Sequence, residues 1–322
     1  MEKEFIGIEI GGTKLQVVTG DGSGMIHERL RYAIVKENGA EGIKKQIDEA
    51  LNILQSRIRP LAVGIGFGGP VNRETGKISL SFHIEGWADF DLVHWLHARV
   101  KVPVFIENDG NVAALGEAKH GAGRDYRDVF YITLGSGVGG GLVNKGRIYH
   151  GAFPGEAEIG HVRLDRLGST METNCSGWSV DRKIREAITG GTDSLLGQLA
   201  KDAGRAEARY LGPALEQGDS LAKQILQETG ADIAFGLSHV VHLFHPEIII
   251  LGGGLSLIGE PLRAVVEAEL RPYLMEAFLP GPQVVLSHLK EDAVPAGALA
   301  LASQMHTQLA DTADHRIADA AF

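Results

Sequence analysis

Three glycine clusters in this chain each follow a short apolar segment. They are Gly11-Gly12-Thr13-Lys14, Gly135–Gly141 and Gly252-Gly253-Gly254. Glycine at the end of a strand lets the backbone approach a ligand closely and direct its N–H groups at an anion. One such cluster is more typical of a tight turn, but three clusters in the same position relative to an apolar segment favour a nucleotide-binding site.

The same glycines can be compared with two known nucleotide-binding patterns. The phosphate-binding loop GxxxxGK[ST] is absent from the sequence, which excludes the class of ATPases built on it. The pattern GxGxxG occurs at 64–69 and at 135–140, but in a dinucleotide-binding fold its third glycine opens a helix. Residues 70–77 instead predict a turn, and residues 141–148 predict a strand and another turn. A dehydrogenase is therefore not indicated.

Two acidic residues, Asp109 and Glu158, are candidates for a catalytic or binding carboxylate. Asp109 and the preceding Asn108 lie between the apolar segment Val104–Ile106 and the start of a predicted helix. Asp and Asn are also favoured as helix N-caps, so a purely structural role is open as well. Glu158 lies in a glycine-rich segment, 151–160, that predicts an irregular loop, where binding residues collect. The alternative for Glu158 is a solvated surface charge.

The apolar pattern predicts the strands and helices that would hold these residues. The order strand, glycine cluster, strand occurs twice. The first copy has strands at 5–10 and 14–18 on either side of the first cluster, and the second has strands at 129–134 and 142–144 on either side of the second cluster. This repetition, about one domain length apart, predicts an internal duplication and two related α/β domains. The remaining predictions are helices at 42–56, 111–119, 179–187, 206–216, 220–244, 261–270 and 296–309 and strands at 61–67, 103–107, 248–251 and 283–287.

In six segments, in chain order, the sequence closely resembles the ROK family of sugar kinases, part of the actin-like, hexokinase-type ATPase superfamily. The segments are GIEIGGTK (7–14), GIGFGGPV (64–71), IENDGNVAALGE (106–117), TLGSGVGGG (133–141), GEAEIGH (155–161) and IIILGGGL (248–255). The resemblance spans 7–255, with a closing segment PAGALALA at 295–302. It implies an α/β, actin-like ATPase (ribonuclease H-like) duplicated fold with a cleft between two domains. We place a smaller N-terminal domain at 1–120, on which a C-terminal helix at about 296–310 packs, and a larger domain at 121–295.

The resemblance also implies an activity, the ATP-dependent phosphorylation of a hexose, and a role for each matching residue. Asp109 is then the general base that takes the proton of the attacking sugar hydroxyl, and Asn108 contacts a sugar hydroxyl. Glu158 and His161 hold the sugar ring, and the opposite wall of the sugar site is formed by Gly68, Gly69 and Asn72. The residues expected to bind ATP are Gly11, Gly12, Thr13, Lys14, Thr133, Gly135, Ser136 and Gly137 around the phosphates and Gly252, Gly253 and Gly254 at the adenosine.

Two features depart from the family pattern. The family usually has an aspartate, thought to help place Mg²⁺, where this chain has Glu9. Many members also bind a structural zinc ion through a CxCGxxGC segment and the histidine that corresponds to His161. Cys175 is the single cysteine here, so at most two of four zinc ligands are present, and we predict no structural zinc. Cys175 is then a small buried residue, His161 donates a hydrogen bond to the sugar, and Asp181 takes the place of the family's late sugar-binding glutamate.

The composition argues against other classes of protein. The chain of 322 residues carries a net charge of −10, and it has no run of Lys and Arg, so a nucleic-acid-binding surface is not indicated. The N-terminus lacks the pattern of a secretory signal, and no apolar stretch reaches the roughly 18–20 residues of a membrane span. A single cysteine fits a reducing compartment. Together these features predict a cytoplasmic protein without membrane or nucleic-acid partners.

The motifs leave the identity of the sugar open. Glucose is the expected substrate, because the Asn108-Asp109 pair and the pair of Glu158 and His161 suit equatorial hydroxyls. Fructose, mannose, N-acetylmannosamine and N-acetylglucosamine kinases share the same residues. Some family members are repressors with a preceding helix-turn-helix domain, which the first strand at Phe5 and the acidic charge disfavour. A non-catalytic sugar sensor is the stronger rival, against which the presence of Asp109 counts. The resemblance also implies a homodimer.

Overall fold

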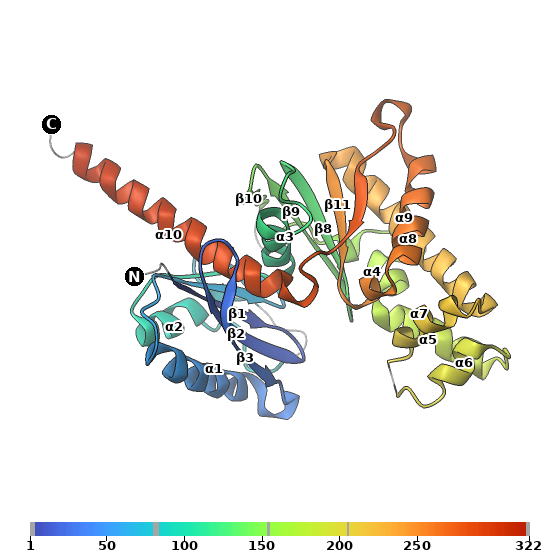
Figure 1. Ribbon diagram of the computed structural model, residues 1–322, viewed down its shortest axis with the longest axis horizontal. Coiled ribbons are helices and arrows are strands. Elements are labelled where there is room, and N and C mark those ends of the chain that lie inside the picture. Colours follow the sequence, from blue (N-terminus) through green and yellow to red (C-terminus); the bar gives the residue numbers. More distant parts are fainter. Residues whose placement is uncertain (1–3, 80–83, 153–154, 205, 320–322) are drawn as a thin grey trace. The chain divides into compact units, whose positions relative to one another are not determined.

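The computed structural model describes residues 4–79, 84–152, 155–204 and 206–319. The chain forms two compact α/β units, shown as ribbons in Figure 1. The first unit comprises the residues up to 124, residues 146–156 and the residues from 291 on, and the second comprises residues 125–145 and 157–290. The domain limits expected from the sequence, 1–120 and 121–295, stay a prediction.

The first unit is built on a mixed sheet with the strand order β3-β2-β1-β4-β7. β1 pairs antiparallel with β2 and parallel with β4, and β4 pairs parallel with β7. All residues of the central strand β1 are buried, as expected for a strand covered on both faces. The strands are β1 Phe5–Ile10, β2 Lys14–Gly20, β3 Ile26–Ala33, β4 Val63–Phe67 and β7 Val104–Asn108.

Helices cover both faces of this sheet. Because side chains alternate along a strand, Ile6 packs in one hydrophobic cluster with residues of α1 and α2, whereas Phe5 packs in another with Leu299 of α10. A Cβ atom on Gly64 of β4 would lie 2.0 Å from the carbonyl oxygen of Ala298, so α10 can lie this close to the sheet only over a glycine. The helices are α1 Gly39–Gln55, α2 Leu92–Val100, α3 Asp109–His120 and α10 Ala293–Asp319.

Several elements of the first unit differ from the sequence-based expectation. α10 begins before and ends after the predicted helix at 296–309, and β3 and α2 were not predicted. The apolar face of the helix predicted at 42–56 is confirmed in α1, where Ile43, Ile47, Ala50, Leu51 and Leu54 are buried. The shorter elements are η1 Lys36–Asn38, β5 Val71–Asn72, β6 Lys77–Ile78, β10 Arg147–Ile148 and η7 Lys290–Asp292.

The second unit repeats the strand pattern of the first. β8 pairs antiparallel with β9 and parallel with β11, and β11 pairs parallel with β12, so β8 takes the place that β1 has in the first sheet. The predicted duplication is therefore confirmed. The expected strand start at residue 142 is wrong, because Gly139–Gly141 already pair with β8 and only Gly135–Gly137 form the turn. The strands are β8 Asp128–Leu134, β9 Val138–Asn144, β11 Ile248–Gly252 and β12 Gln283–Leu286.

Helices of the second unit enclose its hydrophobic core together with the sheet. The predicted helix at 220–244 coincides with α8, whereas the predicted helix at 206–216 is divided into η3 and α7. Over all described residues, no helix combines the length and apolarity needed to cross a membrane. The elements are η2 Ile159–His161, α4 Met171–Cys175, α5 Gly177–Thr189, α6 Leu195–Ala200, η3 Glu207–Tyr210, α7 Leu211–Glu216, α8 Ser220–Phe244, η4 Gly254–Ile258, α9 Glu260–Leu270, η5 Arg271–Tyr273 and η6 Glu276–Phe278.

Candidate active site

Asp109 is the first residue of α3, directly after β7. The N-cap of this helix is Asn108, whose backbone is extended and whose Oδ1 atom accepts hydrogen bonds from Gly110 N at 2.8 Å and Asn111 N at 3.4 Å. Asn108, and not Asp109, is therefore the residue that caps this helix, so the purely structural role considered for Asp109 is already filled. The Asp109 carboxylate lies in the first turn of the helix, where the N-terminal end of the helix dipole favours a negative charge.

Gly68 lies beside this carboxylate, and Gly69 contacts the neighbouring Asn108. A Cβ atom on Gly68 would be 3.3 Å from Asp109 Oδ2, and Gly68 N donates to the carbonyl oxygen of Ile10 at 2.8 Å. Asn108 Nδ2 donates to the carbonyl oxygen of Gly69 at 3.3 Å. The structure thus brings four predicted sugar-site residues together where the parallel strands β1, β4 and β7 end, which is where α/β sheets commonly bind ligands.

Asn72, also predicted in the sugar site, has a local role in the structure. Its Oδ1 atom accepts hydrogen bonds from Glu74 N at 3.1 Å and Thr75 N at 3.0 Å. These bonds hold the turn between β5 and β6, as Asn side chains commonly do. Because the acceptor atom of Asn72 is occupied by this turn, its predicted sugar contact would have to come from the amide nitrogen.

The first glycine turn joins β1 and β2 and holds a buried carboxylate. Gly11 N donates to the carbonyl oxygen of Lys14 at 3.0 Å, which closes the turn. Glu9 is buried, and its two carboxylate oxygens contact Lys14 Nζ at 3.3 Å and Gln16 Nε2 at 2.5 Å. Burial raises the pKa of Glu9 above its ordinary value, although Lys14 and Gln16 act in the opposite direction. The N–H groups of Gly12 and Thr13 are the remaining candidates for a phosphate contact here.

The second glycine turn, between β8 and β9, is held by residues of α4 and α5. Gly135 N donates to the carbonyl oxygen of Gly137 at 3.0 Å, and the carbonyl oxygen of Gly135 accepts from Gly177 N at 2.7 Å. Glu172 of α4 accepts from Val138 N through Oε2 at 3.1 Å. Both polar groups of the Gly135 backbone are thus used within the protein, so phosphate contacts at this turn fall to Ser136 and Gly137.

The third glycine cluster ends β11 beside the second turn. Thr133 of β8 is the register partner of Gly252, and a Cβ atom on Gly253 would lie 2.6 Å from the backbone of Leu134. Gly253 also has a φ of 79°, a conformation that residues other than glycine rarely adopt. Gly254 begins η4. The predicted phosphate turn and the predicted adenosine loop therefore lie together at the carboxyl ends of parallel strands β8 and β11.

Glu158 precedes the short helix η2, and His161 is its last residue. Ala157 has a φ of 56°, which turns the chain into this helix, and Glu158 is its N-cap. The amide of His161 donates to the carbonyl oxygen of Glu158 at 3.1 Å. η2 packs against β9 and against α4. The two predicted sugar-binding side chains therefore lie on one compact turn next to the helix that carries Glu172.

Asp181 lies in a different environment from Glu172. Its Oδ1 atom accepts from Ala208 N at 2.7 Å, and burial raises the pKa of its carboxyl group. Asp181 and Glu207 line a cavity of about 720 Å³ along α5, away from the glycine turn that Glu172 contacts. The structure does not support Asp181 as the late sugar-binding residue, and Glu172 is the better-placed carboxylate. No local pattern in the sequence marks Glu172, because α4 has only five residues and no apolar period.

Cys175, at the end of α4, is fully buried, as predicted. Burial raises the pKa of its thiol, so the thiolate that zinc requires is disfavoured. The residue packs in the hydrophobic core of the second unit. The absence of a structural zinc ion at His161 and Cys175 stays a prediction.

Comparison with known proteins gives consistent matches over nearly the whole chain. The model of the ROK family matches residues 5–305. The glucokinase of Thermotoga maritima is 33% identical over 306 residues, which cover 92% of this chain and 96% of that protein.

Solved structures match over the same extent. A ROK family glucokinase from Streptomyces griseus, solved with glucose and AMPPNP, is 32% identical with a TM-score of 0.81, covering 94% of this chain and 99% of that chain. A ROK hexokinase from Thermus thermophilus is 26% identical with a TM-score of 0.78, covering 95% and 99%. These matches confirm the predicted fold, an actin-like ATPase fold in two α/β domains.

Proposed function

The chain belongs to the ROK family, and we propose that it transfers the γ-phosphoryl group of ATP to a hexose hydroxyl, with glucose as the substrate and glucose 6-phosphate as the product. The observation that carries this proposal is the position of Asp109, in the first turn of a helix capped by its neighbour Asn108 and beside Gly68. Its similarity to the two bacterial glucokinases supports the reaction and the choice of sugar.

Asp109 would act as the general base in this reaction. Its carboxylate takes the proton of the sugar hydroxyl as the oxygen attacks the γ-phosphorus. Gly68 has no side chain, and a Cβ atom there would lie 3.3 Å from Asp109 Oδ2. Asn108 fixes the start of α3 and can offer its amide to a second hydroxyl. Together these residues orient the nucleophile, which is most of what phosphoryl transfer asks of a protein.

The phosphates and their metal ion would meet the two glycine turns. Mg²⁺ bound to ATP neutralises the charge that develops on the phosphoryl group. Glu9 is the residue we propose to hold it, and a single carboxylate suits Mg²⁺, which keeps most of its waters. This role requires that Lys14 leave the Glu9 Oε1 atom and turn to a phosphate.

Glu158, His161 and Glu172 are proposed to hold the sugar ring. Carboxylates accept hydrogen bonds from vicinal hydroxyls, and the imidazole can donate one. These groups do not by themselves distinguish glucose from fructose, mannose, N-acetylmannosamine or N-acetylglucosamine. The predicted homodimer and cytoplasmic location remain predictions.

The decisive experiment measures sugar-dependent ADP release with ATP and Mg²⁺ over a panel of these sugars. We expect turnover with glucose and a decrease of kcat on the order of 10²–10⁴-fold in Asp109→Asn, with glucose binding by calorimetry retained. Asp311→Asn, a change of an exposed aspartate in α10, serves as the control. ADP release with none of the sugars, together with measurable sugar binding, would favour the non-catalytic sensor. Full activity of Asp109→Asn would refute the assigned base.

A further inference from the structure

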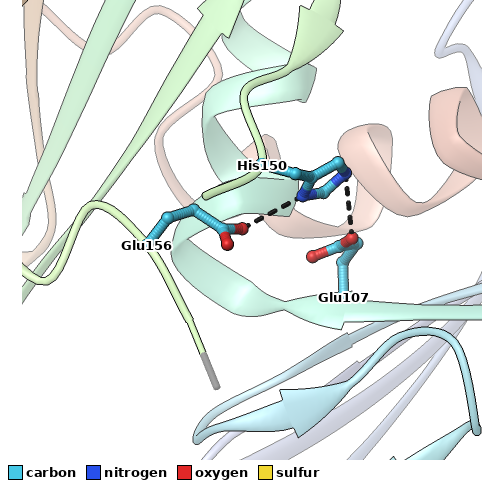
Figure 2. A group of neighbouring side chains, drawn as sticks. All are labelled: Glu107, His150 and Glu156. Atoms are coloured by element: carbon cyan, nitrogen blue, oxygen red, sulfur yellow. Dashed lines mark hydrogen bonds and ion pairs between the residues drawn. The ribbon is translucent and has the colours of Figure 1, made fainter. Parts of the chain in front are cut away.

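A group of potential metal ligands lies in the first unit next to the residues described above. Glu107 is in β7, His150 follows β10, and Glu156 ends the segment 146–156. Figure 2 shows the His150 ring between the two carboxylates, with Nε2 3.4 Å from Glu107 Oε1 and Nδ1 3.1 Å from Glu156 Oε1. One donor atom from each residue lies within 4.8 Å of the others, and within the described residues this is the one such group of three.

A fourth side chain points into the same group and has an unsatisfied atom. Asn111, in the first turn of α3, donates from Nδ2 to Glu156 Oε1 at 2.8 Å and to Glu107 Oε2 at 3.4 Å. Its side chain is almost completely buried, and its Oδ1 atom has no hydrogen-bond partner. Glu156 Oε2 is also buried without a hydrogen bond. Buried oxygens without a donor are costly and rare in folded proteins.

A protonated His150 does not resolve this arrangement. Its two N–H groups would point at Glu107 Oε1 and Glu156 Oε1, so neither reaches Glu156 Oε2 or Asn111 Oδ1. The nearest cation to Glu156 Oε2 in the described contacts is Arg73, whose Nη1 atom is 3.7 Å away, too far for a hydrogen bond. The two cations beside this group, His150 and Arg73, therefore leave Glu156 Oε2 and Asn111 Oδ1 without a hydrogen bond.

The charges in the group point the same way. Burial raises the pKa of Glu107, and the neighbouring Glu156 charge adds to this effect while His150 opposes it. The pKa of Glu156 is lowered, because the hydrogen bonds from His150 and Asn111 outweigh the effect of its burial. Two buried carboxylates on either side of one imidazole form a group whose charge a divalent cation can neutralise.

We propose that Glu107, His150 and Glu156 bind a divalent first-row transition ion, with Asn111 Oδ1 as a further donor after its amide rotates by half a turn. Imidazole nitrogen with carboxylate and amide oxygens suits Zn²⁺, whereas Mg²⁺ and Ca²⁺ prefer oxygen ligands alone. This site is distinct from the position at His161 and Cys175, where no structural zinc is predicted, and it requires no cysteine.

The surroundings provide a route to this site. Glu107, His150 and Arg73 line a cavity of about 590 Å³ that is also bordered by residues of α10. His150 is one-third exposed, whereas both carboxylates are buried. An ion could therefore enter from the cavity and keep a water ligand on that side. A bound ion would fasten His150 and Glu156 to β7 and α3, directly beside Asn108 and Asp109 in the chain.

The test is direct metal binding in the absence of nucleotide and sugar. The protein is treated with a chelator, dialysed, and titrated with ZnCl₂ by calorimetry, and its zinc content is measured after a second dialysis. We expect one zinc ion per chain. Glu156→Gln and His150→Gln should weaken binding by well over tenfold, because even the loss of a residue behind a metal ligand typically costs about 10–100-fold in affinity. Zinc should raise the melting temperature of the wild type but not of these variants.

Two controls keep the result interpretable. His27→Gln removes a histidine that pairs with Glu4 without a third ligand, and it should bind zinc as the wild type does. Cys175→Ser tests the other position, and it too should retain one zinc ion. If the wild type binds no zinc, or if Glu156→Gln and His150→Gln bind it unchanged, the proposal is wrong. Loss of zinc in Cys175→Ser would also contradict it. Circular dichroism tests whether the metal-free variants are folded. If one of them is not, Glu107→Gln provides a third variant.

Discussion

The two glycine turns occupy equivalent places in the two sheets but hold different charges. In the first unit, Lys14 stands at the start of β2 and pairs with the buried Glu9. In the second unit, the charged group at the turn is Glu172, which comes from a separate helix and accepts the Val138 N–H group. The repeated backbone therefore carries a lysine paired with a buried glutamate at one turn and a glutamate that accepts a backbone hydrogen bond at the other. We infer that the first turn contributes more to phosphate binding and the second more to the position of the sugar loop.

The largest effect that separates the two turns is expected from Glu172. Glu172→Ala leaves the Val138 amide without its acceptor and lets the turn move relative to η2, and a displacement of about 1 Å near reacting groups can cost 10²-fold in rate. We expect kcat/KM for glucose to fall by about that factor, and by less in Glu172→Gln, which can still accept the hydrogen bond. Steady-state ADP release measures both.

Glu186→Gln on α5 is the matched control for this change, because Glu186 is exposed and should leave kcat/KM unaltered. Unchanged kinetics in Glu172→Ala would mean that this carboxylate only packs against the turn. The inference that the second turn positions the sugar loop would then be wrong.

A smaller effect, confined to the nucleotide, is expected from Lys14. Lys14→Met removes the positive charge of the first turn, and we expect KM for ATP to rise about tenfold, which corresponds to about 1.4 kcal/mol. The difference from wild type should shrink as salt is added, because a partly exposed charge is screened. Lys45→Met, on the exposed face of α1, should change neither value. An unchanged KM for ATP would remove Lys14 from the phosphate site.

The smallest effect concerns the pH dependence of stability. Because burial raises the pKa of Glu9, the folded chain holds this proton more tightly than the unfolded chain does. The resulting stabilisation is fully present below the ordinary pKa of 4.5 and is lost as pH rises through the folded-state pKa. The Gln side chain of Glu9→Gln has no proton to lose, so this variant keeps its stability as pH rises above about 4.5. Its melting temperature should therefore rise relative to that of the wild type over this range. A difference of a few degrees is expected, on the order of that produced by 1 kcal/mol.

Glu37→Gln, an exposed change in η1, controls for the loss of one surface charge in this comparison. Melting curves of wild type and Glu9→Gln that shift in parallel at every pH would show that burial of Glu9 has no energetic consequence.

Much of the fold could be predicted because it depends on local pattern. β1 coincides with the predicted strand at 5–10 and α8 with the predicted helix at 220–244, since continuous apolar segments and helical periods are properties of neighbouring residues. β3 was missed because it lies at the edge of its sheet and carries polar side chains, among them Arg29 and Arg31, that pair with Asp292 and Glu291. Those partners are far away in the sequence, so no local pattern marks them.

Local sequence was enough to predict the three glycine turns, the position of Asp109 at the junction of a strand and a helix, and the family. Packing over long distances in the chain was needed to show that Asn108 caps α3, that Glu172 rather than Asp181 contacts the second turn, and that Glu107, His150 and Glu156 lie together. One cause underlies each of these differences. A turn or a strand end is specified by adjacent residues, whereas the partner of a buried carboxylate is specified by the register and packing of elements that lie far apart in the chain.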